Sequence, residues 1–138
     1  MSFWLLKTEP GAYSFADLER AGSTVWDGVT SNVALKYMRD ARRGDRAIVY
    51  HSGSERAAIG IAAVTSNPYP DPSAADPHIV VFRLEPIARL ARPVTLAEIK
   101  ADRTFADSPL VRMPRLSVSP LTGEQWRRLE SLAAMRPR

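Results

Sequence analysis

Apolar residues recur along the chain in short runs that end at turn residues, and these runs predict strands. The first is FWLLK at residues 3–7, closed by Pro10 and Gly11, which predicts an opening strand. Further strands are predicted at residues 46–51, 57–65, 79–90 and 116–118. The long run is expected to bend or bulge near Pro86, because proline cannot donate a hydrogen bond to a neighbouring strand.

Helix starts are marked by a hydroxyl residue that is followed three positions later by an acidic or amide residue. This capping-box pattern occurs at Ser14–Asp17, Thr95–Glu98 and Thr122–Gln125. It predicts a helix over 14–21, ended by glycine, a short helix to about residue 101, and a last helix. Four apolar residues of the last helix recur on one inward face, namely Trp126, Leu129, Leu132 and Ala133.

A further helix is predicted after the segment VWDGVTSN, capped by Thr30, Ser31 or Asn32. Its buried face is expected to consist of Val33, Ala34, Tyr37, Met38 and Ala41. The sequence Arg-Arg-Gly at 42–44 is typical of a helix end, with cations near the last carbonyl groups and a glycine free to take a positive φ.

The strand at 57–65 alternates larger and smaller side chains. Ile59, Ile61 and Ala63 are expected on one face and Ala58, Gly60 and Ala62 on the other, which is therefore nearly bare of side chains. Something large can approach such a bare face closely. Residues 67–77, NPYPDPSAADP, contain four prolines and predict a loop that places Tyr69 near the surface.

The predicted order is strand, helix, helix, three strands, helix, strand and helix, without a repeat or a linker. This is not the regular alternation of a doubly wound sheet. It favours an α+β fold around a small, partly closed barrel, in which parallel and antiparallel pairing both remain open. The length of 138 residues predicts a single domain over 1–138.

Composition excludes several kinds of site. The chain has no cysteine and only two histidines, His51 and His78, so we expect no metal centre. The N-terminal apolar run is too short for a signal peptide, and no segment approaches the ~20 apolar residues of a membrane span. We therefore expect a cytoplasmic protein without contact to a membrane.

The chain is basic, with 19 lysine and arginine residues against 15 acids and a formal net charge of +4. This charge permits an anionic partner such as nucleic acid without requiring one. Arginine accounts for 16 of the 19 cations, which suits phosphate recognition and base stacking. A plain compositional bias toward arginine is an equal alternative.

Candidates for catalysis are few. His51 is a candidate base, and Asp27, Asp71 and Asp107 are candidate acids. Neighbouring strand residues point to opposite faces, however, so Tyr50, His51 and Ser52 do not form a catalytic pair by themselves. Phosphate-binding, hydrolase and metalloprotease motifs are all missing from the sequence. We expect a protein that is not an enzyme and carries no cofactor. An enzyme acting on a nucleotide or modified base remains the weaker alternative.

Binding of a flat ligand is better supported. Trp26 could form an aromatic wall, although a core position is an equal alternative, and Asp27 with the backbone of Gly28 and Val29 could meet a polar edge. The helix start at Ser31 and Asn32 offers amide donors, unless those side chains cap the helix.

Cations occur at two further places that suit a ligand. Lys7 ends an apolar strand, where it could donate to a phosphate or carbonyl or merely extend to solvent. Arg112 and Arg115 precede the last strand and could hold a nucleic-acid backbone, with a solvated loop as the alternative.

Motifs spread over nearly the whole chain resemble the EVE domain family. They are WLLKTEP at 4–10, WDGVTSN at 26–32, GD at 44–45, YHSG at 50–53, IGIAAV at 59–64, PYPDP at 68–72, RPVTLAEIKAD at 92–102 and LVRMPRLSVSPL at 110–121. The resemblance implies a PUA-like fold, a mixed β-barrel flanked by helices. It also implies a non-enzymatic reader of modified bases in nucleic acid, with modified cytosine in DNA expected first and an RNA-binding module as the alternative. We expect the protein to be a monomer.

The resemblance further implies the residues of a base pocket. They are Lys7, Thr8, Trp26, Asp27, Gly28, Val29, Ser31, Asn32, Tyr50, His51, Ser52, Leu116 and Ser117. Phosphate contacts are expected from Arg39, Arg43, Arg112 and Arg115. At position 31 the family commonly has asparagine and this chain has serine, whose shorter side chain reaches less far. Either Asn32 replaces it through a local shift or the ligand preference differs.

Overall fold

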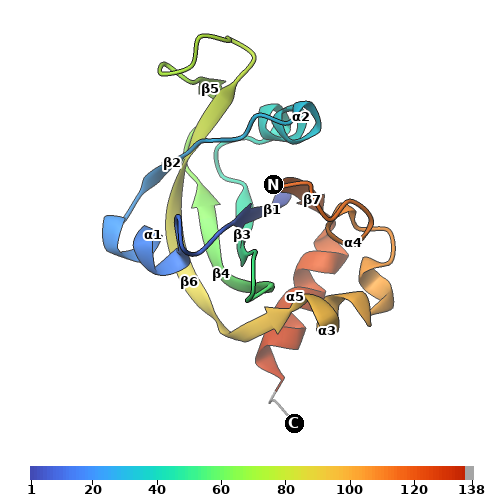
Figure 1. Cartoon of the computed structure of the whole chain (residues 1–138). Coiled ribbons are helices and arrows are strands. Elements are labelled where there is room, and N and C mark those ends of the chain that lie inside the picture. Colours follow the sequence, from blue (N-terminus) through green and yellow to red (C-terminus); the bar gives the residue numbers. More distant parts are fainter. Residues whose placement is uncertain (136–138) are drawn as a thin grey trace.

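A curled, mixed sheet forms the centre of the molecule (Figure 1). The computed structural model describes residues 1–135, and within them seven strands occur in the order β2-β6-β4-β3-β1-β7, with β5 paired to β6. The strands are β1 (Phe3–Thr8), β2 (Thr24–Trp26), β3 (Arg46–His51), β4 (Ala57–Val64), β5 (Tyr69–Pro70), β6 (Val80–Thr95) and β7 (Val118–Leu121). The pairing of β1 with β3 is parallel and the other pairings are antiparallel. The expected α+β class is confirmed.

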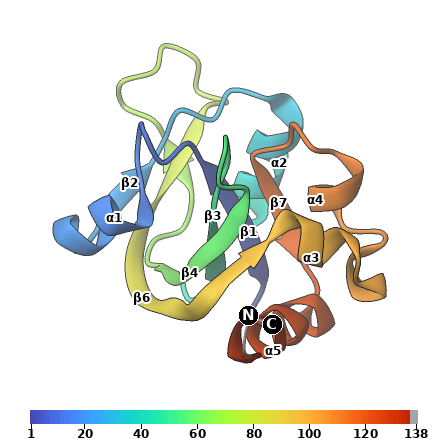
Figure 2. The same cartoon turned by 60° about the horizontal axis from the view of Figure 1, so that its bottom comes forward.

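Helices cover the sheet from opposite sides (Figure 2). They are α1 (Phe15–Ala21), α2 (Asn32–Asp40), α3 (Leu96–Lys100), the 3₁₀ turn η1 (Arg103–Phe105), α4 (Pro109–Arg112) and α5 (Gly123–Ala134). All three predicted capping boxes are present, with both reciprocal hydrogen bonds formed. A local pattern of two side chains was therefore enough to place three helix starts.

Two apolar cores lie on the two faces of the sheet. On β1, Trp4 and Leu6 point to what we call the first face, and Leu5 points to the second. The first-face core also includes Phe15, Leu18, Trp26, Leu35, Met38 and Phe82, so it is closed by α1 and α2. The second-face core includes Ile48, Tyr50, Ile99, Phe105, Leu110, Trp126 and Leu129, so it is closed by α3, η1, α4 and α5. Each strand residue is thereby assigned to one of two separate environments.

Several element predictions were wrong. The strands β2 and β5, the turn η1 and the helix α4 were not expected, and the strand predicted at 116–118 is β7, two residues later. These elements have two to four residues, too few to show a periodicity of their own. The strand β6 continues five residues past the predicted end at position 90.

The buried face of α2 was also partly wrong. Val33 is 42% exposed, whereas Leu35, which the sequence pattern left out, is buried with Ala34 and Met38. Ala41 is buried but follows the helix. Positions 33 and 35 point to nearly opposite sides of a helix, and the packing of the folded chain buries Leu35 rather than Val33.

Bulges alter the faces of β4. The register against β6 shifts between Ala58 and Gly60 and again between Ile61 and Ala62. Against β3, Val49 lies opposite Gly60 and Tyr50 lies opposite Ala58, so Ile59 is an extra residue within β4. Because an extra residue reverses the alternation of the side chains beyond it, Ile59 joins the first-face core and Ile61 packs against the second, contrary to the prediction that they share a face. The second shift lies opposite Pro86 and confirms the expected bulge there.

The large group that approaches the bare part of β4 is Phe15 of α1. A Cβ atom on Gly60 would lie 2.5 Å from two atoms of the Phe15 ring. Because Phe15 is completely buried, its ring has no free space to move into. Glycine at position 60 is therefore what lets α1 lie directly on the sheet.

Gly60→Ala is expected to lower the free energy of unfolding by about 1–3 kcal/mol, because the new methyl group overlaps the Phe15 ring. Chemical denaturation of the purified protein measures the loss. Phe15→Leu removes part of the overlapping ring, so the double variant should lose less stability than the sum of the two single changes. Strictly additive losses would show that the ring is not the obstacle.

Asp45 holds the start of β1 to the turn between α2 and β3. Its buried carboxylate accepts hydrogen bonds from the backbone N–H groups of Ser2 and Arg42 and from the indole Nε1 of Trp4, each at 2.9 Å. The preceding Gly44 takes a φ of +98°, which allows the tight turn. One side chain thus satisfies donors from two distant parts of the sequence.

Candidate functional site

The carboxyl ends of β1 and β3 bring three predicted site segments together. Parallel pairing places Lys7 beside Tyr50 and Thr8 beside His51. The backbone N–H of Ser52 donates to the Thr8 carbonyl at 2.9 Å, and the N–H of Lys7 donates to the Ser117 carbonyl at 2.9 Å. Segments 7–8, 50–52 and 116–117 therefore converge, as expected of a site at strand ends.

Strand alternation nevertheless divides these residues between the two faces of the sheet. Thr8 and His51 point to the first face, toward α1, whereas Lys7 and Tyr50 point to the second face, toward Leu110 and Pro114. The resemblance gave a single pocket, and the structure gives two groups of candidates. Adjacent residues of one strand cannot line the same side.

His51 is fully occupied by the fold. Its Nε2 accepts a hydrogen bond from the backbone N–H of Phe15 at 3.0 Å, and its Nδ1 lies 2.5 Å from Oε1 of Glu55. The Phe15 bond assigns the proton to Nδ1, which then donates to Glu55. Among the described residues nothing links His51 to the exposed Asp27. The alternative acid-base pair therefore has no geometric support, and His51 positions the start of α1.

Thr8 is occupied in a similar way, because its hydroxyl donates to the Tyr13 carbonyl at 2.7 Å. This bond holds the turn between β1 and α1. Thr8 and His51 together thus fasten the α1 end of that turn to the sheet. Their side chains are structural in this arrangement.

Trp26 lies at the end of β2 and belongs to the first-face core, with 7% of its surface exposed. Its ring meets Tyr13 edge-on, with ring centroids 6.4 Å apart and an interplanar angle of 82°. The hydroxyl of Tyr13 is buried and has no hydrogen-bond partner within residues 1–135. A polar atom without a partner beside an aromatic ring is costly unless something else supplies the hydrogen bond.

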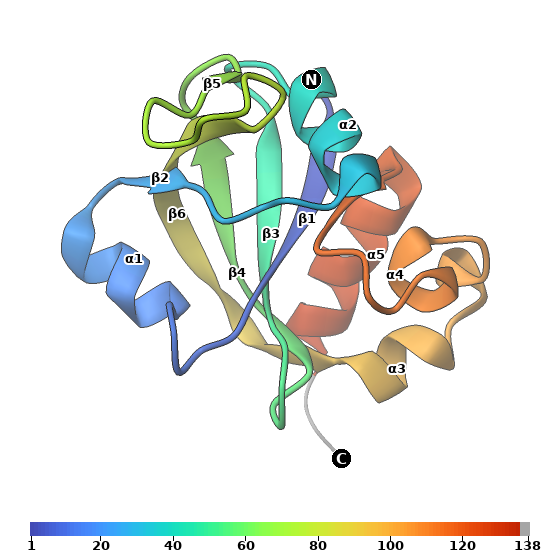
Figure 3. The same cartoon turned by 45° about the horizontal axis from the view of Figure 1, so that its top comes forward.

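The segment from Asp27 to Ser31 runs from β2 to α2 across the sheet (Figure 3). Asp27, Gly28, Ser31 and Asn32 are exposed, whereas Val29 is buried and anchors the segment. Gly28 has a φ of +76°, which glycine adopts without strain. Ser31 occupies the N-cap position of α2, but its side chain makes no capping hydrogen bond. The expected alternative, in which this side chain is used up by capping, was wrong for Ser31.

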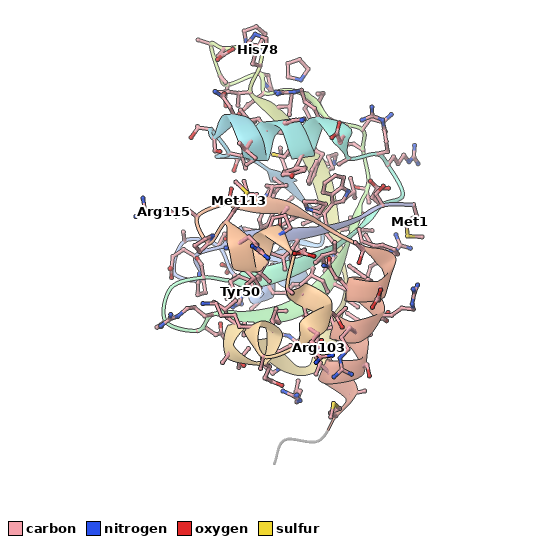
Figure 4. The ribbon with its side chains drawn as sticks, turned by 90° about the vertical axis from the view of Figure 1, so that its right-hand side faces the viewer. Met1, Tyr50, His78, Arg103, Met113 and Arg115 are labelled. Carbon is pink, nitrogen blue, oxygen red and sulfur yellow. The ribbon has the colours of Figure 1, made fainter. Side chains whose placement is uncertain are left out.

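A hollow of about 380 Å³ lies between the first turn of α2 and the loop that precedes β7. We call it the apolar hollow. Its lining residues are Ser31, Val33, Met113, Pro114, Arg115 and Leu116. Met113 and Arg115 lie close together at the same edge of the molecule, and Arg115 extends away from it (Figure 4). Apolar walls with a few polar groups at the rim are typical of a small-ligand site.

A second hollow of about 270 Å³ lies on the second face, and Pro114 lines both hollows. We call it the lysine hollow. Its lining residues are Lys7, Tyr50, Ser52, Gly53, Arg56, Leu96, Lys100, Leu110 and Pro114. Burial lowers the pKa of Lys7 and raises the pKa of Tyr50. Predicted pocket residues therefore line both hollows, which share Pro114.

The four arginines expected at phosphates differ in their availability. Arg112 is bound to Asp107 at 3.1 Å and to the Ala106 carbonyl at 2.9 Å, and Arg39 donates to the His78 carbonyl at 3.0 Å. Arg43 and Arg115 are exposed, and within residues 1–135 neither forms an ion pair. Of the four, Arg115 lines the apolar hollow.

Several site residues were not predicted from sequence. Val33, Met113 and Pro114 line the apolar hollow, and Tyr13 contacts Trp26. The only signal in the sequence was an apolar methionine between Arg112 and Arg115 in a basic loop. Within the described part of the chain no group of acidic and histidine side chains could hold a metal ion, and no helix could cross a membrane.

Comparison with known proteins places these features in context. The family model described as EVE domain matches residues 2–132. Human thymocyte nuclear protein 1 is 28% identical over 170 residues, which cover 99% of this chain and 76% of the human protein. The likeness therefore extends over nearly the whole chain.

Solved structures agree closely with the fold. The protein Rpa0253 from Rhodopseudomonas palustris is 35% identical, with a TM-score of 0.92, over 100% of this chain and 97% of that one. Human THYN1, solved in complex with DNA that contains 5-methylcytosine, is 26% identical, with a TM-score of 0.91, over 99% of this chain and 100% of that one. The expected PUA-like architecture, a curled half-barrel flanked by helices, is confirmed.

Proposed function

This chain belongs to the EVE domain family, and on that premise we propose that it binds nucleic acid and reads a modified base, most favourably a modified cytosine in DNA. The carrying observation is the apolar hollow in a fold that matches a protein solved with 5-methylcytosine DNA over its whole length. The proposal comprises one domain over 1–138 that acts as a cytoplasmic monomer without catalysis, metal or cofactor.

The geometry supports a base in the apolar hollow. A flat base would lie between Val33 on α2 and Met113 and Pro114 on the facing loop. Ser31, whose hydroxyl is not engaged in capping, and the first amide groups of α2 would meet its polar edge. An extra methyl group on the base would add apolar contact that an unmodified base lacks. This arrangement favours a modified base over its parent.

The proposed route of the nucleic acid follows from the exposed cations. Arg115 stands at the rim of the hollow and would contact the phosphate next to the bound base. The unstacking of a base from a duplex costs a few kcal/mol, so a single strand or a weak pair would bind more readily unless the pocket contacts offset that cost. Trp26 does not line the apolar hollow and is 7% exposed, so its proposed role as a wall is tested separately.

Binding of short oligonucleotides tests the proposal. Single- and double-stranded DNA and RNA with 5′-hydroxyl ends would carry cytosine, 5-methylcytosine, 5-hydroxymethylcytosine or N6-methyladenine, at one fixed salt concentration. We expect one modified base to bind at least about tenfold more tightly than its parent, equivalent to ~1.4 kcal/mol. Preference for RNA would favour the RNA-binding alternative. Equal affinity for every base would refute the proposal that the protein reads a modified base.

Val33→Glu locates the site, because it places a carboxylate in the apolar hollow at an exposed position that the fold does not need. We expect affinity for the preferred oligonucleotide to fall about tenfold or more through lost apolar contact and repulsion of phosphate. Ile87→Glu is the matched control, since Ile87 is equally apolar, is 49% exposed and lies on β6 outside the hollow. Equal losses in both variants would place the base elsewhere.

A further inference from the structure

Lysine is rare in this chain, and two of the three lysines line the same hollow. The three are Lys7, Lys36 and Lys100, against sixteen arginines. Lys7 and Lys100 are separated by most of the sequence, yet both border the lysine hollow together with Arg56. A general preference for arginine does not explain why the compact ammonium groups gather here.

The lining of the hollow is cationic. Its lining residues include three cations and no acid. Within residues 1–135 none of the three cations takes part in an ion pair, although ion pairs hold Arg89, Arg92 and Arg128 elsewhere. Two acids lie just outside this lining: Glu9 lies against Gly53, and Glu55, which accepts from His51, lines an adjoining hollow that Arg56 and Lys100 also border. Three unpaired cations facing one space attract an anion.

Hydrogen bonding and ring contact hold the ammonium group of Lys7 where it could bind an anion. Its Nζ donates to the Pro114 carbonyl at 2.8 Å and lies 5.7 Å from the centre of the Tyr50 ring. One of the three ammonium protons is thereby used and the others remain available. Burial lowers the pKa of Lys7, because the charged form loses hydration that no carboxylate replaces. A bound anion would supply the missing charge.

Arg56 and Lys100 are joined through the backbone. Arg56 has a φ of +46° and is the one non-glycine residue among the described positions with a positive φ. Its carbonyl accepts from the N–H of Leu96 at 2.8 Å, which ties it to the start of α3, the helix that ends at Lys100. The charge of Arg56 also reaches Tyr50, because it partly offsets the rise in the pKa of that phenol. A costly backbone conformation at a ligand site has precedent in many proteins.

We propose that the lysine hollow binds a phosphomonoester, supplied either by a free nucleotide or by the 5′-phosphorylated end of a nucleic acid. Three cations suit the dianionic monoester better than the singly charged diester within a chain. The volume of about 270 Å³ lies near the lower limit of small-ligand pockets, so it admits a phosphate with its sugar and excludes a duplex. The Tyr50 ring, Leu96 and Leu110 provide the apolar wall against which a sugar would lie.

The test is a titration of the full chain with inorganic phosphate, deoxycytidine and deoxycytidine 5′-monophosphate, followed by amide NMR shifts. Phosphate and the nucleotide should shift the amides of residues 7, 50–56 and 96–100, and the nucleoside should not. Lys100→Gln, at an exposed position, should weaken nucleotide binding about tenfold. Lys36→Gln removes the same charge from the exposed face of α2 and should leave the affinity unchanged.

Two outcomes would overturn the proposal. One is equal binding by the Lys100→Gln and Lys36→Gln proteins, and the other is nucleoside binding as tight as nucleotide binding. Matched oligonucleotides with 5′-phosphate and 5′-hydroxyl ends then separate the two sources of the monoester. Tighter binding of the phosphorylated end assigns nucleic acid, whereas binding of the mononucleotide alone assigns a free nucleotide. The inference stands apart from base reading, which is measured with 5′-hydroxyl oligonucleotides and Val33→Glu.

Discussion

Trp26→Ala is expected to lower the free energy of unfolding by about 3–5 kcal/mol. The side chain is 7% exposed, belongs to the first-face core and contacts Tyr13 edge-on. Truncation leaves a cavity at the junction of β2 and α1 that the surrounding groups cannot fill. Chemical denaturation measures the loss, and a stability close to that of the parent protein would show that Trp26 is dispensable for the core. Because the loss is large, this variant cannot by itself report on binding.

Trp26→Phe separates the core role of Trp26 from its proposed role as a pocket wall. Phenylalanine keeps an aromatic ring in the core but withdraws the outer edge of the indole. Trp126→Phe is a matched control, since Trp126 has the same 7% exposure but lies in the second-face core, stacked on Phe3 at 4.7 Å. If Trp26 forms a wall, only Trp26→Phe weakens binding of the modified oligonucleotide. Equal affinities in the two variants would restrict Trp26 to the core.

Asp45→Ala is expected to cost about 2–4 kcal/mol, because it leaves the indole N–H of Trp4 and two backbone N–H groups without their acceptor. Asp40→Ala is the control: Asp40 is exposed at the end of α2 and its loss should change stability by less than about 0.5 kcal/mol. Thermal and chemical denaturation measure both. A similar small change in the two variants would show that water satisfies the three donors equally well.

The preference for a modified base should survive Asp45→Ala below its lower melting temperature. Asp45 lines neither hollow, so its loss weakens the anchoring of β1 without changing the surfaces that contact a ligand. A changed base preference in this variant would mean that the anchoring of β1 is transmitted to the strand ends at Lys7 and Thr8. The comparison therefore distinguishes residues that stabilise the fold from residues that contact the ligand.

Elements determined by local interactions could be predicted from the sequence. The capping boxes at Ser14, Thr95 and Thr122 each depend on two side chains within one turn, and each helix begins where that pattern predicts. The bulge near Pro86 follows from a property of that one residue. The order of the main strands along the chain could also be predicted, because each apolar run and the turn residues that end it are local in sequence.

Features decided by distant residues could not be predicted in this way. The extra residue of β4 opposite β3 places Ile59 and Ile61 on different faces, and the packing of the folded chain buries Leu35 and leaves Val33 exposed.

The candidate site shows the same limit. The resemblance collected Lys7 and Thr8 into one pocket, whereas strand alternation separates them. Arg56 and Lys100 were not singled out, because only the folded chain brings them near Lys7. The base pocket expected from the resemblance therefore remains a proposal, which the variants of Val33 and Trp26 test.

The position of β1 between β3 and β7 has a consequence for synthesis on the ribosome. Phe3 pairs with Leu121, more than a hundred residues later, while the other edge of β1 pairs in parallel with β3. Contacts between such distant segments slow folding, because a long loop must close before they form. β1 leaves the ribosome before its partners and must therefore wait, with one hydrogen-bonding edge open, until β7 has been made. A chaperone that shields this edge would protect the nascent chain from edge-to-edge aggregation.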